Sequence, residues 1–130
     1  SFTPNEIETE VHPNTVDIAM TGSSGRRMTV RGESLGGGKI RITRINQAEV
    51  DFSGEYNTLI VIQKDRQGVI AHITGCLSKA NVNIAFLKLF REAKGSTAYS
   101  IVEFDGSLPE GIPDEIRKNP NVKDVMLIEL

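Results

Sequence analysis

The chain is poor in cysteine, with one, Cys76, among 130 residues. One thiol forms no intrachain disulfide and no multi-cysteine metal site, and an iron–sulfur cluster needs several thiolates. We therefore expect this chain alone to hold no metal and no cluster. The N-terminus also lacks a basic region followed by an apolar stretch. Together with the single cysteine, this predicts a cytoplasmic protein.

An excess of charge of either sign is missing too. The formal net charge is −2, with 6 basic and 8 acidic residues in the first 56 positions and 9 of each in the remainder. Neither part is basic enough to favour a nucleic acid as partner. No apolar run approaches the roughly 18 residues that a membrane span needs, so we expect no membrane partner either.

The motifs of a complete active site are absent as well. The sequence contains no nucleophile–base arrangement, no Walker loop and no dinucleotide fingerprint. We therefore assign no catalytic residue. A ligand-binding or assembly module fits the sequence better than a complete enzyme.

What is present begins with four short alternating runs in residues 1–56. Turn-forming residues separate the runs, and the pattern predicts antiparallel strands at 15–21, 26–33, 39–45 and 48–52. Ile45 is out of phase with Ile40 and Ile42, so the alternation slips near the end of its strand. The runs hold few large apolar residues, which predicts that 1–56 is only part of a larger, β-rich domain.

Residues 57–130 show a different pattern. The continuous apolar run at 59–62 predicts a strand that is buried on both faces. Helical spacing of apolar residues follows, and the whole half predicts a helix at 69–80, strands at 82–90, 97–104 and 122–130, and a short helix near 109–118. The order is βαββαβ, a ferredoxin-like plan, so the predicted fold class is α+β.

The strand at 82–90 is apolar on both faces, with Ile84 and Phe86 on one and Leu87 and Leu89 on the other. Two helices cover only one face of a four-stranded sheet, and a unit of this size has a small core. We therefore expect a partner surface here, and specifically a homodimer formed through residues 57–130.

Two places in this half contain candidate ligand-binding residues. Gly68 and Val69 open the predicted helix, where exposed backbone amides attract carboxylates, and Asp65 begins the turn before them. A helix cap and a turn glycine explain the same residues structurally. Asn83 is unusual inside a strand. It either binds the polar groups of a ligand or is a polar residue at a strand edge.

Residues 1–56 offer another candidate, for binding an anion. Gly36, Gly37 and Gly38 are able to form a nest of successive amides, with a flexible loop or bulge as the alternative. His12 and Asn14 combine an ionisable group with a turn former, and a simple turn is the alternative there. A single histidine without other metal ligands nearby does not indicate a metal site.

Two residues of the predicted helix at 69–80 carry reactive groups in positions that favour structural roles. His72 lies at the edge of the apolar stripe and is expected to be a partly exposed surface residue. Cys76 belongs to the stripe and is expected to pack in the core. We therefore assign neither residue to a site.

Two stretches resemble the ACT domain pattern, which is D/N-x-x-G-hydrophobic, about a dozen helical residues, then hydrophobic-Asn-Ile. They are Asp65-Arg66-Gln67-Gly68-Val69-Ile70 and Ala80-Asn81-Val82-Asn83-Ile84-Ala85. The resemblance implies an ACT domain at 57–130 that pairs side by side with another copy and binds an amino acid at the interface. Position 67 is Gln where many members have Pro. In serine-sensing members the polar ligand residues correspond to Asp65 and Asn83.

The stretches at 11–15 and 34–40 are similar to the β chain of bacterial iron–sulfur L-serine dehydratase, and with the ACT pattern the resemblance covers essentially the whole chain. That family converts L-serine to pyruvate and ammonia with a [4Fe–4S] cluster whose cysteines lie in an α part. Its Ser-Ser-Ser-His-Thr stretch is absent here. The resemblance implies an inactive regulatory fragment, with 1–56 from an allosteric-substrate-binding-like domain. Its partners would be the α part and a small amino-acid effector such as L-serine. The resemblance also implies that His12 and Gly36–Gly38 lie in the portion that faces the catalytic part or an anion.

Two other interpretations stay open. Some D-3-phosphoglycerate dehydrogenases place a similar β-rich domain before an ACT domain and are inhibited by serine, so the chain resembles their regulatory end as well. The other interpretation is a free-standing sensor or assembly module without an attached enzyme. The stretch at 12–15 and the triple glycine favour the dehydratase.

Overall fold

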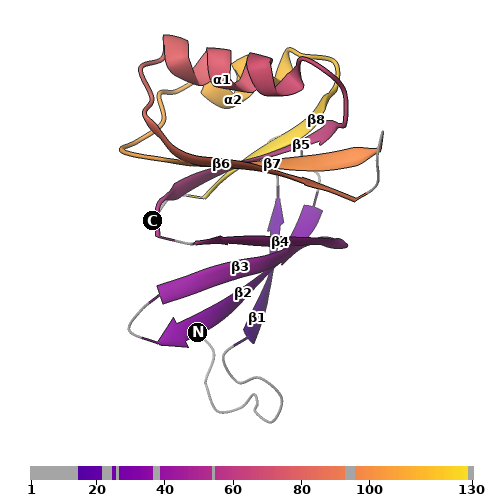
Figure 1. Cartoon of the computed structure of the whole chain (residues 1–130), viewed down its shortest axis with the longest axis vertical. Helices are drawn as coiled ribbons and strands as arrows, with labels where there is room; N and C mark the ends of the chain where they lie inside the picture. Colours follow the sequence, from indigo (N-terminus) through magenta and orange to yellow (C-terminus); the bar gives the residue numbers. More distant parts are fainter. Residues whose placement is uncertain are drawn as a thin grey trace.

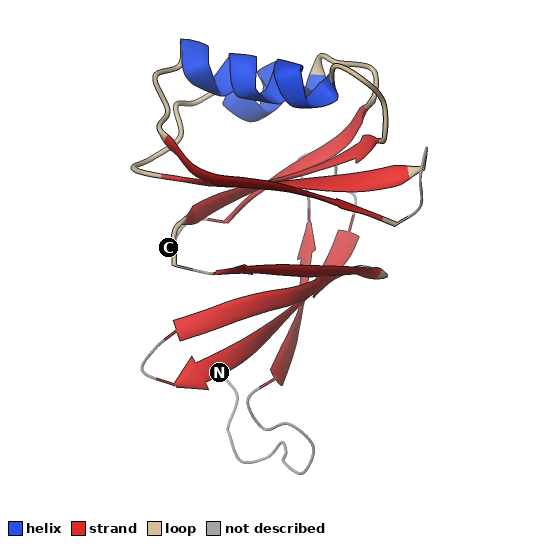
Figure 2. Ribbon diagram, viewed as in Figure 1, coloured by secondary structure: helices blue, strands red, loops and turns tan. Residues whose placement is uncertain are grey.

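The computed structural model describes residues 15–21, 25, 27–36, 39–53, 55–92 and 96–128. These residues form two four-stranded antiparallel sheets and two helices, arranged in three layers (Figure 1, Figure 2). The helices cover one face of the second sheet, and the first sheet lies on the opposite face. The fold class is α+β, as the sequence predicts. Within these ranges no helix is long and apolar enough to cross a membrane.

The first sheet is a meander in which each strand pairs with the next. Its strands are β1 (Thr15–Thr21), β2 (Arg27–Gly36), β3 (Lys39–Ile45) and β4 (Ala48–Ser53). Buried and exposed residues alternate along β4 and the first part of β2, which places one face against a core. Strand β2 continues to Gly36, so the glycine-rich break starts later in the chain than the sequence suggested.

The slip in the apolar pattern of β3 is a β-bulge. The pairing of β3 with β4 shifts register between Ile42 and Arg44, and the pairing with β2 shifts at the same point of β3. In the pairing with β2 the extra residue is Thr43, which returns Ile45 to the core face, where it is completely buried. The irregular spacing of the isoleucines therefore follows from the geometry of the sheet.

The second sheet and the helices have the predicted βαββαβ order. The elements are β5 (Asn57–Lys64), α1 (Val69–Lys79), β6 (Ile84–Arg91), β7 (Thr97–Phe104), α2 (Ile112–Arg117) and β8 (Val122–Ile128), with strand order β6-β7-β5-β8. The two central strands, β5 and β7, are buried along nearly their whole length. The continuous apolar run at 59–62 therefore does belong to a strand that is covered on both faces.

Two clusters of buried apolar side chains hold the layers together. One lies between the second sheet and the helices and includes Leu59, Ile73 and Ile116. The other lies between the two sheets, where Phe52 of β4 joins Ile101 of β7. The face of the second sheet that the sequence analysis left for a partner is thus covered by strands of the same chain, because residues 15–53 bury their own apolar face there.

Strand β6 is an edge strand of its sheet, and both of its apolar faces pack against other residues of the chain. Leu87 packs against the helix-side cluster and Phe90 against the cluster between the sheets. Phe86 keeps 38% of its surface exposed. The two-sided pattern that motivated a homodimer is therefore largely explained within one chain, and the homodimer stays a prediction.

Candidate functional site

The turn between β5 and α1 is shaped by a glycine. Gly68 is the N-cap of α1 and has φ 87°, in the left-handed region that glycine adopts without strain. No side chain caps the helix. The structural alternative in which Asp65 caps α1 is therefore wrong, whereas the turn-glycine explanation of Gly68 is confirmed. Val69, the first residue of the helix, is completely buried, so the single chain exposes neither its side chain nor its backbone to a ligand.

Asp65 is held in place by a cation from the edge strand β6. The Nε atom of Arg91, at the end of β6, lies 3.0 Å from Oδ2 of Asp65. The backbone N–H of Asp65 donates to the carbonyl of Ser96 at 2.7 Å. The side chain of Asp65 is only 13% exposed. The turn thus presents an ordered carboxylate beside the positive end of α1.

Asn83 lies at the other end of the same sheet. It precedes β6 rather than lying inside it, and its Nδ2 donates to Oδ2 of Asp105 at 2.7 Å. Ile84 pairs with Phe104, whereas Arg91 pairs with Ala98 at the opposite end of β7. Helix α1, with 11 residues, spans about 16 Å between the two ends. One chain therefore does not bring Asp65 and Asn83 together.

The candidates in the N-terminal half are mostly outside the part of the chain that the structure describes. His12, Asn14, Gly37 and Gly38 all fall there. Gly36 is described. It closes β2, pairs with Lys39 and has φ 88°, the conformation that a tight connection between antiparallel strands requires. The turn is therefore a sufficient explanation of Gly36.

His72 ties the two helices together. Its Nε2–H donates to the carbonyl oxygens of Ile116 at 3.0 Å and Glu115 at 3.2 Å, in the last turn of α2. The residue is partly buried, and the sequence analysis missed this contact because it depends on how α2 packs. Both carbonyls also accept backbone N–H groups, Glu115 from Lys118 at 3.2 Å and Ile116 from Asn119 at 3.3 Å, so His72 adds a second donor at this helix end.

A groove of about 490 Å³ runs beside His72 and is also lined by Cys76, Lys79 and Glu115. The Sγ atom of Cys76 is 3.8 Å from Nε2 of His72. Burial raises the pKa of the Cys76 thiol, and the charge of Glu115 raises it further. The thiol is therefore not activated as a nucleophile. Among the residues that the structure describes, no group of three or more His, Cys, Asp or Glu is placed to hold a metal ion.

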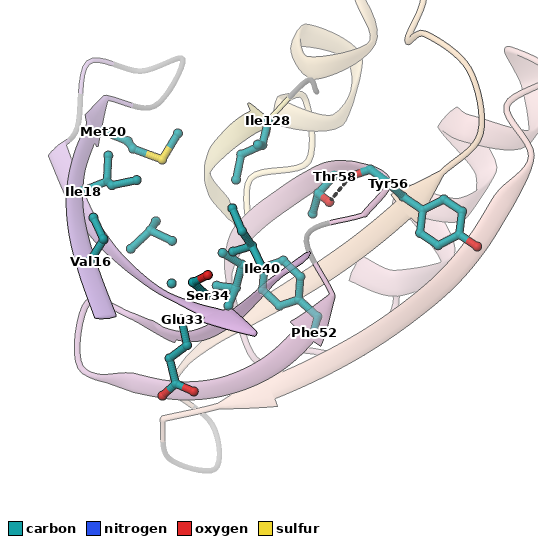
Figure 3. A pocket seen from close by; sticks show the side chains of 13 residues that line it. Val16, Ile18, Met20, Glu33, Ser34, Ile40, Phe52, Tyr56, Thr58 and Ile128 are labelled. Carbon is teal, nitrogen blue, oxygen red and sulfur yellow. Dashed lines mark hydrogen bonds between the residues drawn. The ribbon is translucent and has the colours of Figure 1, made fainter. Parts of the chain in front are cut away.

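An apolar pocket of about 310 Å³ opens between the first sheet and β8, and the sequence analysis did not identify it (Figure 3). Val16, Ile18 and Met20 of β1 face Ile128 of β8 across it. The carboxylate of Glu33 points away from these side chains. The alternation in β1 predicted a strand with one apolar face, but it did not indicate that this face lines a pocket. Its mainly apolar lining, which also includes the aromatic residues Phe52 and Tyr56, is suited to apolar groups.

The comparisons with known proteins confirm the resemblance to L-serine dehydratase β chains. No protein-family model matches the chain. It is 35% identical over 118 residues to the probable L-serine dehydratase β chain of Bacillus subtilis, covering 91% of this chain and 53% of that protein. Identity to the L-serine dehydratase β chain of Peptoniphilus asaccharolyticus is 30%, covering 88% of this chain and 52% of that protein. The chain thus spans about half the length of these relatives.

A second group of relatives consists of D-3-phosphoglycerate dehydrogenases. The D-3-phosphoglycerate dehydrogenase of Synechocystis is 27% identical over 119 residues, which covers 92% of this chain and 21% of that enzyme. This dehydrogenase also matches nearly the whole chain, but the dehydratase β chains are more similar to it.

Proposed function

We propose that the chain is a regulatory and assembly part of an iron–sulfur L-serine dehydratase, the enzyme that converts L-serine to pyruvate and ammonia. In this proposal residues 57–130 form a ferredoxin-like ACT domain, and residues 1–56 belong to a β-rich domain of the same enzyme. The similarity to two dehydratase β chains over about nine-tenths of the chain supports it. The βαββαβ order of the second half agrees with it.

The cluster of such an enzyme does not fit this chain. Its one thiol, Cys76, is partly buried in α1, and a [4Fe–4S] cluster needs several thiolates. In our proposal an α part therefore supplies the cluster and the catalytic residues. The contribution of this chain is then to assemble with that part and to respond to an effector.

The observation that best defines an effector site is the separation of Asp65 and Asn83. Since they lie at opposite ends of one sheet, a site that uses both needs two copies of the chain. A two-fold arrangement with the α1–β6 sides together and running in opposite directions places Asp65 of one copy near Asn83 of the other. The carboxylate of an amino acid would bind the exposed backbone at Gly68, at the start of α1, and its ammonium group would bind Asp65.

Calorimetric titration with L-serine tests this site. Asp65→Ala and Asn83→Ala should each weaken binding by about 1.5–3 kcal/mol, the scale of a hydrogen bond to a charged group. Glu49→Gln, an exposed change on the first sheet, is the matched control and should bind like the wild type. If wild type binds neither L-serine nor another small amino acid, residues 57–130 act in assembly only.

Mixing the two defective variants tests whether the site is shared. In a two-fold dimer of Asp65→Ala with Asn83→Ala, one of the two sites carries both substitutions and the other carries none. An equal mixture that exchanges subunits should therefore regain about one quarter of the wild-type sites, with wild-type affinity. Failure to regain any site, although the mixed dimer forms, would place the two residues in separate sites.

The regulatory end of a D-3-phosphoglycerate dehydrogenase is the second candidate, because relatives with that name also match most of the chain. The full-length gene product that contains this chain distinguishes the two. We expect it, with its α part, to form pyruvate from L-serine. Nicotinamide-dependent oxidation of 3-phosphoglycerate instead would support the dehydrogenase.

A further inference from the structure

Strand β1 is an end strand that carries an exposed apolar side chain. Among the described residues it pairs with β2 alone, so the outer side of its backbone is open to another strand. Ile18, at the midpoint of β1, keeps 51% of its surface exposed. Val16 and Met20 lie on the same face of the strand and line the apolar pocket with it (Figure 3). The edge at β1 therefore offers backbone hydrogen-bonding groups and apolar side chains together.

The other three end strands of the described sheets are less regular. The pairing of β4, β6 and β8 with their inner neighbours contains a register shift in each case, whereas β1 pairs with β2 without a shift over all seven residues. Irregular edges and charged side chains are means by which proteins prevent their sheet edges from pairing with other chains. Glu49 and Asp51 lie on β4, Lys88 on β6 and Lys123 on β8. Of these four strands, β1 is thus the one best suited to pair with a further strand.

The one charged residue of β1 is neutralised within the chain. Asp17 accepts two hydrogen bonds from Arg31 of β2, at 2.8 and 3.1 Å. Both residues lie on the face opposite to Ile18. The strand contains no lysine, arginine or proline. No unpaired charge on β1 therefore opposes the approach of a second strand.

The sequence of β1 is complementary to itself when two copies run antiparallel. With a two-fold axis through Ile18, each residue faces the one at the same distance on the other side of residue 18. The facing pairs are Ile18–Ile18, Val16–Met20, Asp17–Ala19 and Thr15–Thr21. The first two are apolar pairs on the side of the pocket, the last is a favourable pair of threonines, and no two like charges meet.

We propose that β1 is a contact between two copies of this chain, which pair antiparallel about Ile18. The two first sheets then form one continuous sheet, and the apolar pockets of the two copies adjoin at their Ile18 side chains. Such an isologous contact is the usual form of a two-fold dimer. It is separate from the effector site, because β1 lies across the pocket from Ile128 of β8, and β6 is at the opposite end of that sheet. The contact forms whether or not L-serine binds.

Sedimentation equilibrium of wild type, Ile18→Lys and Ile40→Lys tests this contact. Wild type should associate, and Ile18→Lys should weaken the association at least about tenfold, because two lysines would face each other across the axis. Ile40→Lys is the matched control, since Ile40 is 49% exposed and lines the same pocket but lies on the inner strand β3. It should associate like wild type. A monomeric wild type, an unchanged Ile18→Lys or equal losses in both variants would overturn the proposal.

Mixing two defective variants shows whether residue 18 faces itself. Ile18→Glu should also weaken self-association, because two carboxylates would then meet at the axis. An equal mixture of Ile18→Lys and Ile18→Glu should return to the average mass of wild type, since opposite charges meet in the mixed dimer. Circular dichroism checks that each variant is folded. Folded variants that form no mixed dimer would show that residue 18 does not lie on a two-fold axis.

Titration with L-serine separates this contact from the effector site. Ile18→Lys should give the same calorimetric result as wild type, whether that result is binding or none, because Asp65 and Asn83 lie at the α1–β6 side. Asp65→Ala and Asn83→Ala should in turn leave the pairing at β1 unchanged. A different L-serine affinity in Ile18→Lys would mean that the β1 contact builds the effector site, and would contradict a separate interface.

Discussion

The two sheets each contain four antiparallel strands, yet they meet solvent in different ways. Strands β5 and β7 are buried at almost every position, whereas burial alternates along β4 and the first part of β2. The reason is the number of covered faces. Helices and the first sheet cover the two faces of the second sheet, and the first sheet has a cover on one face only. A continuous or an alternating apolar pattern thus indicates how many layers a sheet touches.

The difference makes the two sheets unequal in stability. The buried residues of the first sheet, such as Val30 and Phe52, lie in the cluster shared with the second sheet. The second sheet has in addition its own cluster beneath the helices. We therefore expect the first sheet to depend on the second for its core, while the second keeps one core without the first.

Ile101→Ala tests this dependence and should have the largest effect. Ile101 is completely buried at the contact between the sheets, so truncation should cost about 2–5 kcal/mol of the free energy of unfolding. Ile18→Ala removes the same atoms from β1, where the side chain is 51% exposed, and should cost about 1 kcal/mol or less. Denaturant unfolding followed by circular dichroism measures both. Equal losses would mean that the first sheet carries as much of the core as the second.

His72→Ala tests how firmly helix α2 is attached to α1 in the helix layer, which covers only the second sheet. Loss of the hydrogen bonds to Ile116 and Glu115 should reduce the free energy of unfolding by about 0.5–1.5 kcal/mol. Hydrogen exchange should rise in α2 and remain unchanged in β1 to β4. Unchanged exchange in α2 would show that the contact contributes nothing to the attachment of that helix.

Asp17→Asn should have the smallest effect, because it lies on the solvent side of the first sheet. Arg31 donates two hydrogen bonds to the Asp17 carboxylate, at 2.8 and 3.1 Å, and holds its pKa below the ordinary 3.8. Both side chains are exposed, so solvent screening reduces the loss to a few tenths of a kcal/mol. The contribution is present above the ordinary pKa and is lost as the pH falls through the lowered one. Unfolding at low and high salt measures it, and a loss above about 1 kcal/mol would contradict this account.

Most of the secondary structure was predictable because periodicity is local. The alternation and the helical spacing predicted the eight strands and two helices of the described residues, with errors near Gly36 and Asn83, where the chain leaves or enters a strand. The bulge at Thr43 appeared in the sequence only as a phase error of Ile45. A bulge is defined by the pairing of two strands. The pattern of one strand therefore shows the position of an irregularity but does not identify it as a bulge.

The candidate site was less predictable, because it depends on how elements are placed. Since β5 and β6 run in the same direction with α1 between them, Asp65 and Asn83 had to lie at opposite ends of the sheet, and that part followed from topology. The Arg91 partner of Asp65, the contact of His72 with α2 and the burial of Glu103 depend on packing between distant segments. No sequence spacing reports such contacts.

The pairing of β5 with β8 has a consequence for synthesis of the chain. Thr58 pairs with Ile128, so the ribosome must synthesise about 70 further residues before β5 can pair with β8. The hairpins of the first sheet connect near neighbours and can close early, since short loops form faster than long ones. Their apolar face, however, is covered by β5, β7 and β8 together. We therefore expect the nascent first sheet to leave the ribosome as a preformed but uncovered surface, and to depend on chaperones until β8 emerges.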